Sequence, residues 1–249
     1  MKKNLFARVA GIVLVALPLL AGAAGVDIPL DRAPVDLKNK PSLQRGAQTF
    51  VNYCLNCHQA SMMRYSRLTD LGLTEQQIKE NLMLASDKFG DTMTTALNPV
   101  DAKAWFGGVP PDLSVIARSR GADWLYTFLR SYYRDDKSPT GWNNRAFPAV
   151  GMPHVLHELQ GTQQWQQVGE RKGHDGKMEP MMKLVLTQPG ALKPLEYDQM
   201  VGDLVNYLVF MGEPAAAKRT QLGVLVLMFL SVLLVFAIVL KKEYWKDVK

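Results

Sequence analysis

A run of nineteen residues without a charged side chain lies near the C-terminus, from Leu222 to Leu240. As a helix with a rise of ~1.5 Å per residue it is ~29 Å long, about the thickness of the hydrocarbon core of a bilayer. Four lysines follow the run and two basic residues precede it, with Tyr244 and Trp245 as an interfacial anchor. The run therefore predicts a transmembrane helix with a cytoplasmic C-terminus, rather than a buried soluble helix.

The N-terminus has the three zones of a cleaved secretory signal. Three positive charges lie in the first eight residues, 9–20 is an apolar run of twelve, and small residues follow at Ala21 and Ala23. The alternative is an uncleaved membrane helix, but twelve apolar residues interrupted by Pro18 are short for a span. The expected organisation at a bacterial inner membrane is a signal peptide (1–23), a periplasmic domain (24–217), an anchor (218–240) and a cytoplasmic tail (241–249).

The amino-acid composition excludes several classes of protein. Charged residues make up 21% and hydrophobic residues 47% of the chain, which excludes an intrinsically disordered protein. The net charge of +6 is concentrated at the two ends and leaves only +1 for residues 9–240, so no nucleic acid is expected as a partner. The two cysteines, Cys54 and Cys57, are too few for a disulfide-rich scaffold.

Apolar residues recur at helical spacing in four stretches, which predict helices over 42–53, 74–85, 122–133 and 196–211. Pro41 favours the start of the first helix, and Gly212 and Pro214 favour the end of the last. Prolines, glycines and asparagines predict a long loop over 136–153, and the polar residues 161–180 predict an exposed excursion. Strand signals are weak throughout, so the predicted class is mainly α with long irregular loops.

The sequence Cys54-Leu55-Asn56-Cys57-His58 is a C-x-x-C-H motif, the attachment signal for a c-type haem. Two thiols form thioethers with the haem vinyl groups, and the adjacent histidine reaches the iron. A thioredoxin-like thiol pair belongs in a βαβ context, which is not visible here, and a zinc site lacks a second cysteine pair. One motif predicts one covalently bound haem c.

The second axial ligand has several candidates, because the chain contains twelve methionines. A methionine thioether raises the reduction potential and suits an electron carrier. Met152 is favoured because it lies in a loop whose prolines and glycine can hold a side chain over the haem face. The alternatives are Met178, Met181 and Met182 after a charged loop, and His154 and His157, whereas Met200, Met211 and Met228 are expected to be core residues.

Longer motifs resemble the cytochrome c1 family, the haem subunit of quinol:cytochrome c reductase. The resemblance runs almost end to end and includes Arg45-Gly46 through the haem motif, Pro110-Pro111-Asp112-Leu113-Ser114 followed by Arg118 and Arg120, Gly141-Trp142-Asn143-Asn144 with Gly151-Met152-Pro153, Asp203-Leu204-Val205-Asn206-Tyr207-Leu208, Gly212-Glu213-Pro214 and the C-terminal anchor. The C-x-x-C-H motif alone specifies only a c-type haem. The Pro-Pro-Asp-Leu-Ser segment together with the anchor is far more specific.

The resemblance implies a c-type cytochrome domain with one transmembrane helix, and Met152 as the second iron ligand beside His58. It implies that Pro110 and Pro111 pack against the haem and that Arg120, with Arg118 as the alternative, meets a haem propionate. It also implies an aromatic partner of a propionate at Trp124 or Tyr126.

The function implied is electron transfer from a Rieske iron–sulfur protein, beside a cytochrome b subunit in the lipid bilayer, to a soluble or tethered c-type cytochrome. The chain is then an enzyme only as a subunit, with no catalytic residue of its own. The alternatives are a stand-alone tethered monohaem cytochrome that serves an oxidase or peroxidase, and a haem-based sensor with an open sixth iron position.

Overall fold

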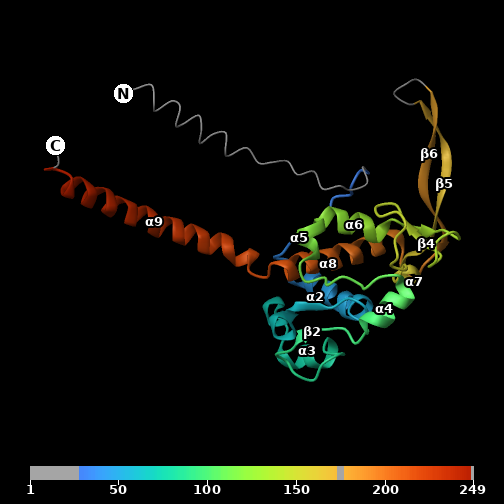
Figure 1. The fold of residues 1–249 in the computed structure, drawn as a ribbon, viewed down its shortest axis with the longest axis horizontal. Coiled ribbons are helices and arrows are strands. Elements are labelled where there is room, and N and C mark those ends of the chain that lie inside the picture. Colours follow the sequence, from blue (N-terminus) through green and yellow to red (C-terminus); the bar gives the residue numbers. More distant parts are fainter. Residues whose placement is uncertain (1–27, 173–176, 248–249) are drawn as a thin grey trace.

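The computed structural model describes residues 28–172 and 177–247, so the predicted signal peptide and His174 lie outside the described residues. Its helices are α2 (Lys40–Thr49), the π-helix η1 (Phe50–Cys54), the 3-10 helix η2 (Tyr65–Leu71), α3 (Glu75–Asn81), α4 (Pro99–Phe106), α5 (Ile116–Arg120), α6 (Ala122–Arg130), α7 (His157–Gln160), α8 (Pro194–Gly212) and α9 (Ala216–Tyr244). Its strands form antiparallel pairs of β1 (Ala60–Arg64) with β2 (Thr92–Met93), β3 (Tyr132–Arg134) with β4 (Trp142–Asn144), and β5 (Gly161–Lys172) with β6 (Met178–Pro189). Figure 1 shows a helical body from which α9 and the β5–β6 hairpin project.

The centre of the body is the contact between α2 and α8. Gly46 of α2 lies against α8 so closely that a Cβ atom there would be 2.1 Å from the Asp203 carbonyl oxygen. Phe50 and Tyr207 pack together beside it, with ring centroids 5.6 Å apart. Both rings are fully buried. The absence of a side chain at Gly46 therefore allows the two backbones to meet.

Polar side chains of α8 hold the same contact. Asp203 accepts hydrogen bonds from both Nε and Nη2 of Arg45, at 2.6 and 3.2 Å. The buried Asn206 donates from Nδ2 to the Asp36 carbonyl and the Ser42 hydroxyl and accepts from the Asp36 amide. Each buried polar group thus has partners, which offsets the cost of removing it from water.

The four predicted helices are confirmed, but α3 ends at Asn81 and α6 at Arg130, both earlier than predicted. The 42–53 helix begins two residues early, at Lys40, because Asn39 caps it by accepting from the Ser42 amide. The 122–133 helix ends at Arg130, where the Ser131 hydroxyl turns back to the Thr127 carbonyl. Residues 132–134 instead pair with 142–144, so the predicted long loop contains a short strand.

The sequence-based expectation of weak strand structure is wrong for residues 161–172 and 178–189. These two segments pair as the strands of a hairpin that leaves the body, as the upper right of Figure 1 shows. Gln163 anchors its base by donating to the Arg130 and Tyr132 carbonyls, at 3.0 and 3.1 Å. The first strand is rich in glutamine, which has little strand preference of its own, so the pairing with β6 makes the strand. The expectation of an exposed excursion is confirmed.

Helix α9 extends alone from the opposite end of the body (Figure 1). Its segment Gln221–Tyr244 is long and apolar enough to cross a membrane, and none of that apolar window is buried against the other residues that the structure describes. Met228 lies in this segment with 57% of its surface exposed, so its assignment to the core is wrong. Met211 is buried and Met200 packs against the core, as expected.

We expect Gly46→Ala to destabilise the haem domain. A Cβ atom at this position meets backbone that cannot move aside, and such overpacking costs about 1–3 kcal/mol. Denaturant unfolding of the detergent-solubilised protein measures the loss. Gly90→Ala is the matched control, because a Cβ there meets nothing within 4 Å. Equal stability of the two variants would contradict the assigned role of Gly46.

Candidate functional site

The haem motif lies where the first helix of the domain ends. Helix α2 widens into the π-helix η1, which ends at Cys54, and the next turn closes with the His58 amide donating to the Cys54 carbonyl at 2.8 Å. Single π-turns of this kind are frequent at functional sites. Because α2 packs closely against α8, the motif directly follows the central helix contact of the body.

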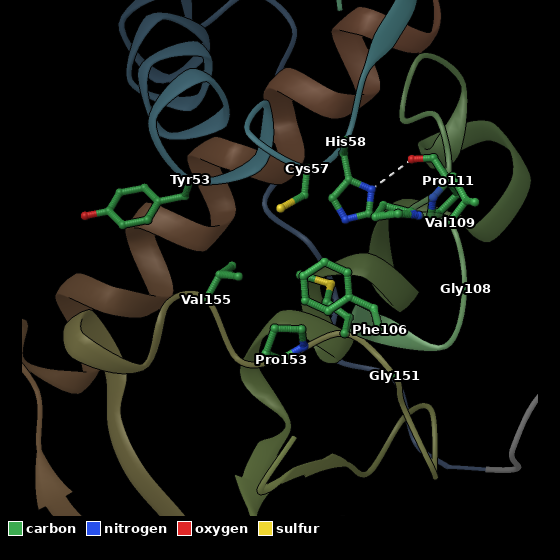
Figure 2. Close-up of a pocket in the computed structure, with 12 residues that line it drawn as sticks. Tyr53, Cys57, His58, Phe106, Gly108, Val109, Pro111, Gly151, Pro153 and Val155 are labelled. Atoms are coloured by element: carbon green, nitrogen blue, oxygen red, sulfur yellow. Dashed lines mark hydrogen bonds between the residues drawn. The ribbon is translucent and has the colours of Figure 1, made fainter. Parts of the chain in front are cut away.

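Two cavities, of about 190 and 330 Å³, adjoin the motif. Both are lined by His58, Pro111, Gly151 and Met152. Cys57 lines the smaller cavity and Cys54 the larger one. In Figure 2, Cys57 and His58 reach the smaller cavity from one side, and Gly151, Pro153 and Phe106 face them from the other. The two cavities therefore lie side by side between His58 and the 151–153 loop, with one thiol lining each.

The His58 ring is oriented by one hydrogen bond. Its Nδ1 lies 2.8 Å from the Pro111 carbonyl oxygen, drawn as a dashed line in Figure 2. Because a carbonyl can only accept, Nδ1 carries the proton and Nε2 keeps its lone pair. Burial lowers the pKa of His58, although the bond to Pro111 acts in the opposite direction. A neutral imidazole with a free Nε2 is the form that ligates iron.

The loop that carries Met152 is held by two asparagine side chains. Asn144 is fully buried, donates to the Phe128 carbonyl at 2.7 Å and accepts from the amides of Ala146 and Phe147. Asn143 accepts from the Ala149 amide at 2.9 Å, where Ala149 has a positive φ of 58°. These bonds give the strained loop one conformation. In the sequence both asparagines indicate only a loop and part of a family motif, and nothing there signals this role.

Among the described residues, Met152 is the one methionine that lines both cavities. Met178, Met181 and Met182 lie on β6, opposite Lys172, Gly169 and Gln167 of the hairpin, and line neither cavity. Of the candidates considered from sequence, the fold therefore brings Met152 and not the other three to His58.

The two nearby histidines have other partners. His154 is buried, its Nε2 lies 2.7 Å from the Gln160 side-chain oxygen, and its ring stacks on Tyr132 with centroids 4.6 Å apart. His157 is exposed, and its Nδ1 donates to the His154 carbonyl. Neither lines either cavity. His154 thus supports the loop behind Met152, whereas the sequence suggested a ligand or a rim residue.

Arg120 lies at the end of α5 and lines the larger cavity, together with Trp124. Its guanidinium carbon is 5.0 Å from the centre of the Trp124 ring. Arg118 instead lies beside Gly212 and lines neither cavity. Tyr126 also turns away, with the Arg130 guanidinium 4.5 Å from its ring centre. Arg120 rather than Arg118, and Trp124 rather than Tyr126, therefore face the larger cavity.

The residues present fit a covalently bound haem. The cavities are lined mostly by apolar side chains, with Arg120 as a cation at the edge of the larger one and a cysteine beside each. The described residues contain no group of three or more histidine, cysteine or acidic side chains placed to hold a metal ion directly. A flat apolar group that enters between His58 and Met152 matches this arrangement.

Comparisons with known proteins agree with this geometry. The model of the Cytochrome C1 family matches residues 32–248. Cytochrome c1 of Allochromatium vinosum is 47% identical over 95% of this chain and 96% of the relative, and that of Rhodospirillum rubrum is 32% identical over 85% and 83%. A Nitrosomonas europaea protein named ammonia monooxygenase gamma subunit is 49% identical over 93% of this chain and 94% of the relative.

We expect Met152→Leu to retain the covalent haem and to lower its reduction potential. Leucine has a similar volume but no sulfur, and axial ligands set haem potentials over a range of about 0.8 V. A redox titration followed optically measures the change. Met211→Leu is the matched control in the core. An unchanged potential with an unchanged sulfur–iron charge-transfer band would remove Met152 from the site.

Proposed function

We propose that this chain, which belongs to the cytochrome c1 family, passes electrons from a Rieske iron–sulfur protein to a c-type cytochrome in the periplasm. As a member of that family it is the electron-transfer haem subunit of a bc1-type quinol–cytochrome c oxidoreductase, and it binds haem c covalently. It is membrane-anchored, and the family works together with cytochrome b and the Rieske protein.

One observation carries the site assignment. His58 and Met152 lie on facing irregular segments and line the same two cavities, directly beside the two cysteines of the C-x-x-C-H motif. We assign Cys54 and Cys57 to covalent attachment and His58 and Met152 to the two axial positions. A haem held in this way would supply one-electron chemistry.

The remaining residues hold and shield that group. Pro111 borders both cavities and orients His58, and Pro110 lines the smaller cavity beside it. Leu204 and Leu208 of α8 line the larger cavity and make this part of its wall apolar. A nonpolar surrounding with a thioether ligand favours the ferrous form, which suits an electron carrier of high potential. No residue of this chain makes or breaks a substrate bond.

Helix α9 supports the proposed placement of the domain. We assign residues 24–217 to the periplasm, 218–240 to the anchor and 241–249 to a cytoplasmic tail, with 1–23 removed as a signal peptide. Lys241 and Lys242 at the end of the helix support the cytoplasmic side. The anchor keeps the haem domain beside its membrane partners, so electron delivery does not depend on free diffusion.

We expect Arg120→Gln to lower the reduction potential of the haem, on the order of 59 mV or less, the shift that changes a one-electron equilibrium tenfold. The removal of a positive charge near a haem propionate favours the more positive ferric state. A redox titration compares it with Arg118→Gln, the control that lies outside both cavities. A larger shift in the Arg118 variant would reverse the assignment.

Purification from the native membrane in a mild detergent tests the function. We expect optical and electron paramagnetic resonance spectra to show b-type haems and a Rieske-like [2Fe–2S] signal together with the c-type haem. Family membership favours this outcome over a stand-alone tethered cytochrome. A lone c-type haem under several detergents would contradict it. Carbon monoxide binding to the reduced native protein would instead favour a sensor with a displaceable sixth ligand.

A further inference from the structure

Asp112 accepts three hydrogen bonds next to the haem site. Its Oδ1 accepts from the Ser114 amide at 2.7 Å, and its Oδ2 accepts from the Ser61 amide at 3.0 Å and from the Ser61 hydroxyl at 2.5 Å. Ser61 follows His58 by three residues in β1, and Asp112 directly follows Pro111. One carboxylate therefore connects the segment that carries the histidine to the segment that orients it.

Two further bonds join the same segments. The Met62 amide donates to the Ser114 hydroxyl at 3.0 Å, and the Leu113 amide donates to the Gln59 carbonyl at 2.9 Å. Ser114 is buried. Residues 59–62 and 112–114 thus form a short clamp, which we name the Asp112 clamp, immediately beyond His58 and Pro111.

Pro111 needs such a clamp because little else fixes its carbonyl. A proline has no N–H to donate, and residues 108–113 belong to no helix or strand. The direction of its carbonyl towards His58 Nδ1, 2.8 Å away, therefore depends on the next residue being held.

We propose that Asp112 is a positioning residue for the axial histidine: through the clamp it holds the Pro111 carbonyl on His58 Nδ1 and so sets the orientation of the His58 ring. The inference rests on the proposed function, in which His58 ligates the haem iron. Outer partners of a ligating histidine determine its tautomer, its ring angle and its strength as a donor.

The charge state of Asp112 supports the role. Burial alone raises its pKa, but the hydrogen bonds from Ser114 and Ser61 outweigh burial, and the pKa lies below its ordinary value. The group is therefore a carboxylate at neutral pH, which can accept all three bonds at once. An asparagine at this position has a single acceptor oxygen and cannot replace it.

The test compares Asp112→Asn with wild type as full-length holoprotein in detergent. The chain has only four histidines, so ¹⁵N-histidine labelling gives a simple spectrum of imidazole N–H groups in the reduced protein. We expect hydrogen–deuterium exchange of the His58 Nδ1–H to become at least tenfold faster. We also expect the g values of the ferric form to shift, because they depend on the orientation of the axial ligands.

Asp91→Asn is the matched control, because Asp91 also accepts from a serine hydroxyl, but from that of Ser86, which belongs to neither segment of the Asp112 clamp. It should change neither readout. Unchanged exchange and g values in Asp112→Asn overturn the inference and leave the proposed function intact. A wild-type protein without a histidine–methionine low-spin signal overturns both.

If Asp112→Asn does not fold or does not retain haem, a second variant tests the same inference. Ser61→Ala removes only the hydroxyl donor, while the backbone bond from the residue 61 amide to Asp112 remains. We expect faster exchange of the His58 Nδ1–H here too, by a smaller factor. Exchange as slow as in wild type would overturn the inference.

Discussion

The approach of α8 to Gly46 determines where the haem motif can lie. Because a Cβ there would meet backbone at 2.1 Å, only glycine lets the two helices touch, and the Arg45–Asp203 pair then holds them in register. Helix α2 continues through η1 to Cys54, and α8 presents Leu204 and Leu208 to the larger cavity. One close contact therefore places the attachment motif and one wall of its cavity together.

The two sides of the site are held by different means. On the histidine side, the carbonyl of Pro111 orients the ring and a cluster of polar bonds lies just beyond it. On the methionine side, Asn143 and Asn144 fold the loop, and Tyr132 stacks on His154 behind it. Both sides consist of irregular chain, so satisfied polar side chains give them the rigidity that helices and strands supply elsewhere.

Most of the helices could be predicted because their apolar faces recur at the helical period and pack against one another. The β5–β6 hairpin could not, because its first strand is rich in glutamine and obtains its structure from pairing and from Gln163 at its base. The early end of α6 was missed for a related reason: residues 132–134 join a strand pair with 142–144, and this tertiary pairing overrides the local apolar pattern.

The sequence by itself determined the membrane anchor, the covalent haem attachment and His58 as the histidine of the attachment motif, because each depends on residues that are adjacent in the chain. It also favoured Met152, but left several methionines and two histidines open. Only the tertiary structure brought Met152 to His58 across 94 positions, directed His154 to Gln160, and separated Arg120 from Arg118. The physical reason is that these choices depend on which side chains meet in a shared cavity, and the folded packing alone decides that.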